Sequence, residues 1–271
     1  MRASQTLSIC IAGATGWAGR AVTQGVVDAA DLTLRSAVGR SAAGRDLGES
    51  LGRDSLQVPV YASARDALEG VDVLIDYTSV DVVKDNVLTA IAAGVAVVIA
   101  TSGLTAADYE EIDSAARERS VGVVAAGNFS LTAAMCQAAA VLAARHLPHW
   151  EVIDYASATK PDVPSGTARE LAERLGDVRP PEIGYPIAEL HGPQEARGVT
   201  VEGTQVHSVR LPSFVVSTEV VFGLPDERLT IRHDAGGSPE LYVAGTLIAA
   251  RRAPELTGLT RGLDTLLLGT G

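Results

Sequence analysis

The sequence predicts an α/β protein: a doubly wound parallel sheet, followed by a second domain of α+β type with a mostly antiparallel sheet. Through the first half of the 271 residues, short aliphatic runs alternate with stretches of helical length, as in sheets whose parallel strands are buried on both faces. Beyond residue 148, the apolar runs are separated by turn residues instead of helices, which indicates antiparallel strands. Hydrophobic residues make up 46% of the chain and aromatic residues 4%, so an aliphatic core is expected.

The elements of the first domain follow one another in regular alternation. A short aliphatic run stops at Gly13, the run VDVLID ends on an acid, and VAVVIA is apolar throughout. Apolar runs of about four to eight residues bounded by glycine or polar residues are typical of buried strands. Strands are therefore predicted at 7–12, 32–38, 71–76, 95–100 and 121–126, and helices at 18–29, 82–93, 106–118 and 131–144.

The second domain begins near Pro148 and has shorter, β-like runs. Turn residues such as Pro212-Ser213 separate these runs, and a helix is expected after the small residues at 165–167. A segment rich in Pro and Gly predicts a long loop at 179–203. Strands are predicted at 150–156, 206–211, 217–222 and 228–231, and helices at 168–175 and 242–252.

The composition excludes several classes of partner. Acidic residues outnumber basic ones by 33 to 22, a net charge of −11 that argues against nucleic acid or an anionic membrane. No apolar run reaches the ~18 residues of a membrane span and no signal peptide is recognisable, so we expect a cytoplasmic protein with a small-molecule substrate. Cys10 and Cys136 are predicted to be buried free thiols, and no ligand spacing predicts a metal site.

A glycine-rich loop joins the first strand to the first helix: Gly13-Ala14-Thr15-Gly16-Trp17-Ala18-Gly19. Such glycines allow a tight turn, close approach of a pyrophosphate to the backbone, and close packing of the helix on the sheet. The required strand and helix flank the loop, so residues 13–18 predict a Rossmann-like dinucleotide site rather than a plain βα turn.

The end of the second strand indicates which dinucleotide is bound. Enzymes that use NAD usually have an acid there for the ribose 2′-hydroxyl, whereas this chain has Gly39, Arg40 and Ser41. A 2′-phosphate needs a cation and a hydroxyl, so these residues predict a preference for NADP(H) over NAD(H). The alternative is that Arg40 is only a solvated surface residue.

Small polar residues follow three further strands. Open α/β sheets bind ligands at the carboxyl ends of their strands, so these residues are predicted to complete the cofactor site. Each of them taken singly could instead be a helix cap. The residues are Tyr77, Thr78, Thr101, Gly103, Asn128 and Phe129.

An anion receptor is predicted in the second domain. Lys160 precedes a loop of small residues that opens a helix, and Ser165, Gly166 and Thr167 lie at the helix start. Free backbone N–H groups, two hydroxyls and a lysine suit a carboxylate or a phosphate. Simple capping of the helix is the alternative.

These motifs together resemble the dihydrodipicolinate reductase family, in family order across nearly the whole chain. The resemblance implies that residues 1–130 bind the dinucleotide, that 131–239 bind substrate and form the oligomer, a homotetramer, and that 240–271 pack back on the first domain. It implies hydride transfer from NAD(P)H to a cyclic imino dicarboxylate in lysine biosynthesis, with Lys160, Ser165, Gly166 and Thr167 at the substrate positions. The matching segments are GATGWAGR at 13–20, VLIDYT at 73–78, ATSGL at 100–104, NFS at 128–130, KPDVPSGTA at 160–168 and HSVRLP at 207–212.

The chain departs from the family pattern just before Lys160. Members of the family carry two adjacent histidines there, one implicated in protonation and one in holding a carboxylate, and Ala156 and Ser157 take their places. A well-placed general acid contributes ~10²–10⁴-fold to the rate, so the family's usual reaction is expected to be slow here unless Lys160, Tyr155 or water supplies the proton. Thr218 and Ser238 also depart from the pattern, where histidine and arginine are usual.

Three functions are compatible with these residues. The first is an NADPH-dependent reductase of a C=N or conjugated C=C bond in a cyclic imino carboxylate, whether the lysine intermediate or another compound, with Lys160 as the catalytic residue. The second is the ordinary lysine-pathway reductase with a different proton donor. The third is a non-catalytic, NADP-binding paralogue.

Overall fold

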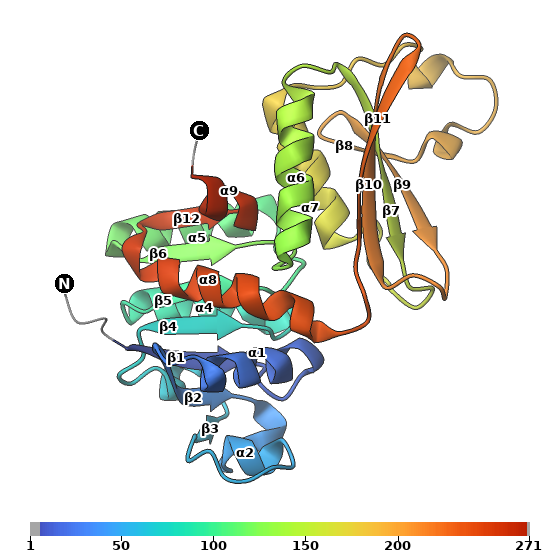
Figure 1. The fold of residues 1–271 in the computed structure, drawn as a ribbon. Helices are drawn as coiled ribbons and strands as arrows, with labels where there is room; N and C mark the ends of the chain where they lie inside the picture. The colour runs from blue at the N-terminus through green and yellow to red at the C-terminus, as the bar shows by residue number, and fades with distance from the viewer. Residues whose placement is uncertain (1–5, 270–271) are drawn as a thin grey trace. The chain divides into compact units, whose positions relative to one another are not determined.

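A computed structural model describes residues 6–269 of the chain. The described residues form two compact units (Figure 1). The first unit contains the described residues up to Leu131 and those from Pro239 onward, and the second unit contains Thr132–Ser238.

The first unit is built on a parallel sheet, in which the described residues supply seven strands in the order β12-β6-β5-β4-β1-β2-β3. Its central strands are continuous aliphatic runs buried on both faces, as a doubly wound sheet requires. The strands are β1 (Leu7–Ala12), β2 (Leu32–Val38), β3 (Val60–Tyr61), β4 (Val73–Asp76), β5 (Ala96–Ile99), β6 (Gly122–Ala125) and β12 (Gly258–Arg261).

Helices of the first unit lie on both faces of this sheet (Figure 1). On one face, apolar residues of α3, α4 and α5 form one cluster with those of the strands, and Thr105 and Asp108 form a capping box at the start of α5. Helices α1 and α8 pack closely, since a Cβ added to Gly25 would lie 2.3 Å from Val243 Cγ1. The helices are α1 (Trp17–Asp28), α2 (Leu47–Ser50), α3 (Ala64–Ala67), α4 (Val80–Ala92), α5 (Ala106–Arg119), α8 (Val243–Arg252) and α9 (Leu263–Leu268).

The carboxyl ends of four strands are level with one another. Ala12, the last residue of β1, pairs with Val38 of β2 and Asp76 of β4, and Asp76 pairs with Ile99 of β5. The loops that follow these strands therefore emerge at one edge of the sheet, where open α/β sheets bind their ligands.

The second unit is built on a mixed sheet, in which the described residues supply five strands in the order β11-β10-β7-β9-β8. The β7–β9 pair is parallel and the other pairs are antiparallel, as the prediction of a mostly antiparallel sheet requires. The strands are β7 (His149–Ala156), β8 (Val199–Val201), β9 (Thr204–Arg210), β10 (Val216–Leu224) and β11 (Glu227–Asp234).

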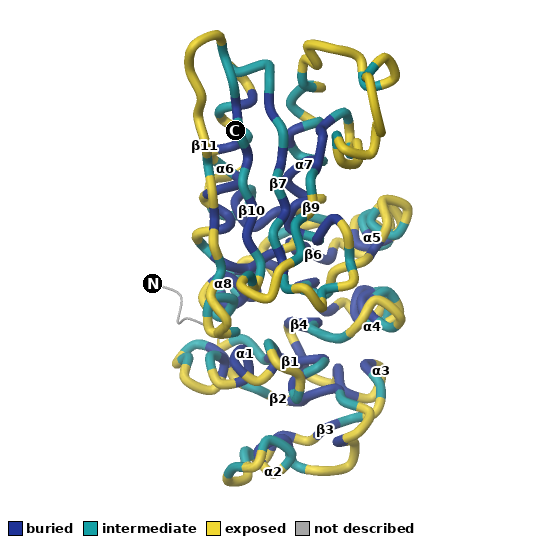
Figure 2. Tube along the Cα trace, turned by 90° about the vertical axis from the view of Figure 1, so that its right-hand side faces the viewer, coloured by how far each residue is buried: buried dark blue, intermediate teal, exposed yellow. Residues whose placement is uncertain are grey.

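One face of this second sheet is covered by α6 (Leu131–Ala144) and α7 (Gly166–Val178). Strand β7 alternates strictly: Trp150, Val152, Asp154 and Ala156 are buried on the helix side, and the residues between them are half-buried. Strand β11 and the segment that follows α7 are largely exposed (Figure 2).

The fold class predicted from sequence is confirmed, and the predicted bounds of β1, β2 and α6 match. The segment predicted as a loop at 179–203 contains two 3-10 turns (Ile187–Glu189 and Gln194–Arg197) and strand β8. Strands β3 and β12 were not predicted, because two residues give no periodic signal and GLTR contains no apolar run.

Candidate functional site

The glycine-rich loop of the first unit is shaped by contacts that leave no space for side chains. Gly13 has a φ of +80°, and a Cβ there would lie 2.3 Å from the Tyr77 carbonyl oxygen. A Cβ on Gly19 would lie 2.1 Å from the Gly13 oxygen, so this glycine lets α1 pack against the loop. Both glycines are thus sterically required in the roles that the sequence predicted.

The start of α1 offers free N–H groups to an anion. Gly16 is the N-cap, it provides no side-chain cap, and the first turn contains no acidic residue. Ala14 is buried, whereas Trp17 is 55% exposed beside this turn, and the Thr15 carbonyl accepts a hydrogen bond from Arg20 Nε at 2.9 Å. The backbone cradle and the positive end of the helix dipole fit a pyrophosphate.

The end of β2 presents a cation and no acid. Arg40 is exposed, and its guanidinium makes no ion pair with any described residue. Ser41 lies in the same 3-10 turn, where its carbonyl accepts from Arg45 Nη2 at 2.6 Å. Asp46 is the next acid along the chain, and its carboxylate is engaged by the N–H groups of residues 49, 56 and 58. The exposed Arg40 guanidinium is therefore available to pair with an anionic group on a ribose.

A buried carboxylate, Asp76, ties together the loops after β4 and β5. Asp76 is fully buried, and its Oδ1 accepts from Thr78 N at 2.9 Å, Thr78 Oγ1 at 2.6 Å and Thr101 Oγ1 at 2.9 Å. Its Oδ2 accepts from Asn86 Nδ2 at 2.9 Å. Both predicted cofactor threonines therefore give their hydroxyl hydrogens to Asp76, which was not predicted as a site residue.

Tyr77, between the strand and these threonines, turns toward α8 of the same unit. Its hydroxyl lies 2.7 Å from Thr246 Oγ1, which donates to the Tyr242 carbonyl at 2.8 Å. Burial raises the pKa of the Tyr77 hydroxyl, so the phenol stays protonated. The Tyr77 side chain is thus held by α8, and its carbonyl meets Gly13.

The remaining predicted cofactor residues are mainly held through backbone contacts. Gly103 has a φ of +107° and packs against Val80, so the loop after β5 needs glycine there. Asn128 Oδ1 accepts from Ser130 N at 2.8 Å. The Phe129 side chain is buried, and its carbonyl would lie 2.0 Å from a Cβ on Gly245, which brings α8 against this loop.

In the second unit, the anion receptor (Lys160, Ser165, Gly166 and Thr167) lies at the start of α7. Ser165 is the N-cap and is 1% exposed; its hydroxyl donates to Asp154 Oδ1 at 2.6 Å and accepts from Ala168 N. Its own N–H donates to Asp154 Oδ2 at 2.9 Å. The Ser165 hydroxyl, predicted to hold the substrate, is therefore already used inside the protein.

A carboxylate of the chain itself occupies this receptor. Lys160 Nζ lies 2.9 Å from Asp162 Oδ1, and the N–H of Gly166 also bonds to the Asp162 carboxylate. Burial opposes the ionisation of Asp162, but Lys160 and the neighbouring N–H groups hold its pKa below the ordinary value. The lysine and the helix start thus bind a carboxylate of the chain itself, and any other anion at these donors would share them with Asp162 or displace it.

Asp154 and Arg210 form a buried ion pair beside the receptor. Asp154 is fully buried in β7, and it accepts from Ser208 Oγ at 3.0 Å and from Arg210 Nη2 at 2.7 Å. Neither residue was predicted as a site residue, although an acid at an inward position of an alternating strand was a signal for Asp154.

The positions of the family's histidine pair lack ionisable groups. Ala156 is fully buried, and Ser157 Oγ lies 3.1 Å from Thr159 Oγ1. Tyr155 points to the opposite face of β7, where its ring packs on Phe214 and its hydroxyl donates to Glu219. Tyr155 is therefore not a proton donor for the helix side of this sheet.

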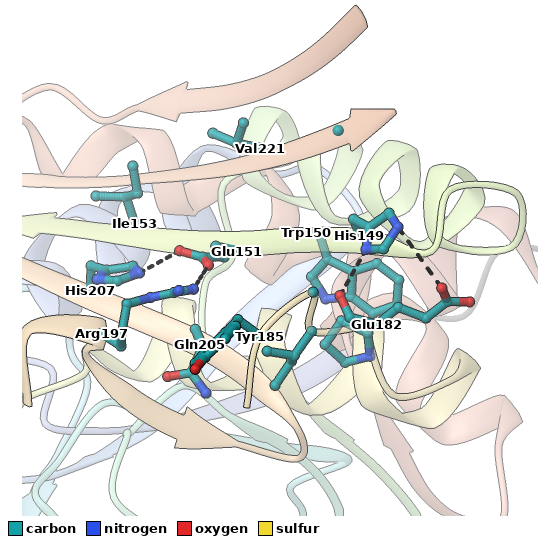
Figure 3. Close-up of a pocket in the computed structure, with 14 residues that line it drawn as sticks. His149, Trp150, Glu151, Ile153, Glu182, Tyr185, Arg197, Gln205, His207 and Val221 are labelled. Atoms are coloured by element: carbon teal, nitrogen blue, oxygen red, sulfur yellow. Dashed lines mark hydrogen bonds and ion pairs between the residues drawn. The ribbon is translucent and has the colours of Figure 1, made fainter. Parts of the chain in front are cut away.

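The second unit also contains a cavity of about 730 Å³ on the sheet face away from α6 and α7 (Figure 3). Glu151 is its central charged group, pairing with Arg197 and, at 2.7 Å, with His207 Nε2. Arg197 is the one arginine or lysine among the described residues of its lining, and it is already paired. This cavity is a poorer site for an anionic substrate than the receptor at α7.

Residues 6–269 contain neither a membrane-spanning helix nor a cluster of metal-ligating side chains. No helix in this range is long and apolar enough to cross a membrane. No three or more His, Cys, Asp or Glu side chains in this range are grouped to hold a metal ion.

Nearly the whole chain resembles known proteins of one family. Residues 7–129 match the family model "Dihydrodipicolinate reductase, N-terminus", and residues 128–267 match "Dihydrodipicolinate reductase, C-terminus". The 4-hydroxy-tetrahydrodipicolinate reductases of Synechococcus elongatus and Desulfitobacterium hafniense are each 37% identical, covering 96% of this chain and 98% of the relative. The dipicolinate-bound dihydrodipicolinate reductase of Paenisporosarcina sp. TG-14 is 28% identical, with a TM-score of 0.77 over 96% of this chain and 99% of that structure.

Proposed function

The chain belongs to the dihydrodipicolinate reductase family and is an oxidoreductase, and we propose that it uses NADPH to reduce a C=N or conjugated C=C bond of a cyclic imino carboxylate. The observation that carries this proposal is the anion receptor at the start of α7. Its lysine and its Gly166 N–H already hold a carboxylate, that of Asp162. The family relationship also speaks against the third alternative, a non-catalytic protein.

The first unit supplies the cofactor site in this proposal. Gly13 and Gly19 leave a backbone cradle that side chains would fill, and the uncapped start of α1 faces a pyrophosphate. Arg40 and Ser41 bind the 2′-phosphate, which favours NADP(H). The loops after β4, β5 and β6, with Asp76 behind two of them, enclose the nicotinamide end. The bound nicotinamide supplies the hydride.

The second unit supplies the substrate site. Lys160 binds the substrate carboxylate together with the N–H groups of Gly166 and Thr167. Ser165, the N-cap of α7, fixes the start of the helix through its two hydrogen bonds to Asp154. Lys160 also donates the proton that accompanies reduction, to nitrogen or to carbon. Tyr155 takes no part, because it lies on the other face of β7.

Two substrates remain distinct candidates. Ala156 and Ser157 offer no cation for a second carboxylate, which favours a cyclic imino carboxylate other than the lysine intermediate. The 37% identity to 4-hydroxy-tetrahydrodipicolinate reductases over 96% of the chain favours the ordinary lysine-pathway reaction with a different proton donor.

Rescue of a lysine auxotroph that lacks this reductase separates the two. Growth of cells carrying the wild-type gene, and no growth with Lys160→Ala, supports the lysine-pathway reaction. No growth, combined with turnover of other cyclic imino carboxylates by the purified protein, supports a changed substrate. Absence of any imine turnover contradicts both.

We further propose a cytoplasmic homotetramer that assembles through the second unit. The sheet of that unit carries helices on one face, while Ile153, Val209 and Val221 are half-buried on the other without a covering helix among the described residues. Cys10 and Cys136 are free and buried, as is usual in a reducing compartment. Light scattering at several protein concentrations tests the assembly.

A further inference from the structure

We propose that Arg210 is a positioning residue of the anion receptor, which acts on the substrate through Asp162 and Lys160. This inference rests on the proposed function, because it concerns the site that the proposed function assigns to the substrate carboxylate. Arg210 ends strand β9 and touches neither the receptor lysine nor the N–H groups of α7 in the contacts of the described residues. Its effect is therefore indirect.

The Arg210 guanidinium connects the sheet to the loop that precedes α7. One nitrogen, Nη2, donates to Asp154 Oδ2 at 2.7 Å and to the Asp162 main-chain oxygen at 2.7 Å. The other, Nη1, donates to the Val209 main-chain oxygen at 3.0 Å and to the Asp154 main-chain oxygen at 3.4 Å. A planar fork with several donors can make these contacts together, and an ammonium group on a flexible stem cannot.

The same ion pair holds the other side of the receptor. Asp154 accepts both the hydroxyl and the N–H of Ser165, the N-cap of α7. The Asp162 end of the loop is thus held by Arg210 and the Ser165 end by Asp154. Because Asp162 in turn holds Lys160 at 2.9 Å, the position of the Lys160 ammonium relative to α7 depends on the Asp154–Arg210 pair.

The charges of these groups support a positioning role rather than direct binding. Arg210 bonds to the Asp154 carboxylate and to the main-chain oxygen of Asp162, whereas the Asp162 carboxylate pairs with Lys160. The Arg210 side chain is 16% exposed and the Asp154 side chain is 0% exposed, so the arginine neutralises a buried carboxylate. Without this partner, the buried charge of Asp154 would strongly destabilise the protein. Of the two cations, Lys160 is the more exposed, at 28%, and is therefore the one that a substrate can reach.

The test variant is Arg210→Lys, which keeps a positive charge opposite Asp154 but loses the fork. Its matched control is Arg232→Lys, in the same sheet but on the other face, where Arg232 pairs with Glu219. The first readout is the Kd of pyridine-2,6-dicarboxylate by titration calorimetry, next to the Kd of NADPH. We expect dicarboxylate binding to weaken about tenfold in Arg210→Lys, with NADPH binding unchanged and the control like wild type.

The second readout does not depend on activity. The wild-type chain has two lysines, Lys84 and Lys160, and the test variant adds a third at position 210 that falls on a different peptide. Amine labelling resolved by peptide mass spectrometry should show faster modification of Lys160 in Arg210→Lys, while Lys84, paired with Asp108 and Glu111 in the first unit, keeps its rate. If wild type fails to bind the dicarboxylate, the lysine-pathway substrate is disfavoured, and the labelling rates still decide whether Arg210 positions Lys160.

A lower melting temperature with unchanged dicarboxylate affinity and unchanged Lys160 labelling would overturn the proposal, since Arg210 would then only stabilise the fold. Should Arg210→Lys fail to fold, the charge-neutral pair Asp154→Asn with Arg210→Gln replaces it, with Glu219→Gln and Arg232→Gln as its control. The same tenfold loss is expected from this pair, and wild-type affinity would refute the proposal.

Discussion

Asp76→Asn should destabilise the first unit and weaken its binding of the cofactor. The asparagine oxygen can still accept from Thr78 and Thr101, but its amide nitrogen would face the Nδ2 donor of Asn86, which now lies 2.9 Å from the carboxylate. One hydrogen bond to a charged group is lost, about 1.5–3 kcal/mol, and a buried donor is left without an acceptor, about 1–3 kcal/mol. Because these two effects overlap, we expect a loss of about 2–4 kcal/mol in the free energy of unfolding.

Urea denaturation gives the stability change, and fluorescence titration gives the Kd of NADPH, which should rise about tenfold because a neutral amide oxygen holds the Thr78 and Thr101 hydroxyls less strongly than a carboxylate does. The exchanged variant Asp76→Asn with Asn86→Asp restores a donor opposite an acceptor and should recover part of both losses. If the single variant unfolds within about 0.5 kcal/mol of wild type and binds NADPH equally well, Asp76 does not organise these loops.

Three further predictions follow from single side chains. Arg40→Glu should weaken NADPH binding by about tenfold or more and NADH binding much less, because only NADPH carries the 2′-phosphate; equal losses in fluorescence titrations would remove that contact. Lys160→Ala should abolish turnover while the Kd of NADPH stays within about threefold, and normal turnover in a steady-state assay would refute the active-site assignment. Burial raises the pKa of the Cys10 thiol from 9.0 to about 12, so the folded protein keeps a proton that the unfolded chain releases above pH 9. The free energy of unfolding should therefore fall as the pH rises from about 9 toward 12, and iodoacetamide should label Cys10 at pH 8 only after unfolding; rapid labelling of the native protein would contradict this.

Local sequence was sufficient for the central strands and the glycine-rich loop. Leu7–Ala12 is a mainly aliphatic run, Leu32–Val38 alternates apolar and polar residues before ending in apolar ones, and both are bounded by polar or glycine residues, so their limits could be predicted closely. Gly13 and Gly19 were identifiable because their role is steric and lies within one βα turn. Two-residue β3 and the edge strand β12 depend on pairing with neighbours, which no local pattern reveals.

The polar networks of the site could not be predicted, because their members lie far apart in sequence. Asp154 and Arg210 are 56 residues apart and meet only through the parallel register of β7 and β9. The direction of the Ser165 hydroxyl could not be predicted for the same reason. It was expected to bind the substrate, but in the structure it donates to Asp154. A motif names the residues at a site, but the direction of each side chain depends on the strands behind it.

The most direct test of the central claim is the oxidation of NADPH by the purified wild-type protein. The assay presents freshly made 4-hydroxy-tetrahydrodipicolinate, a panel of other cyclic imino carboxylates, and matched cyclic imines without a carboxylate. We predict that NADPH is oxidised with at least one imino carboxylate and not with its carboxylate-free partner, and that Lys160→Ala loses this activity. If the protein binds NADPH tightly and oxidises it with none of the imino carboxylates, the proposed reaction is wrong.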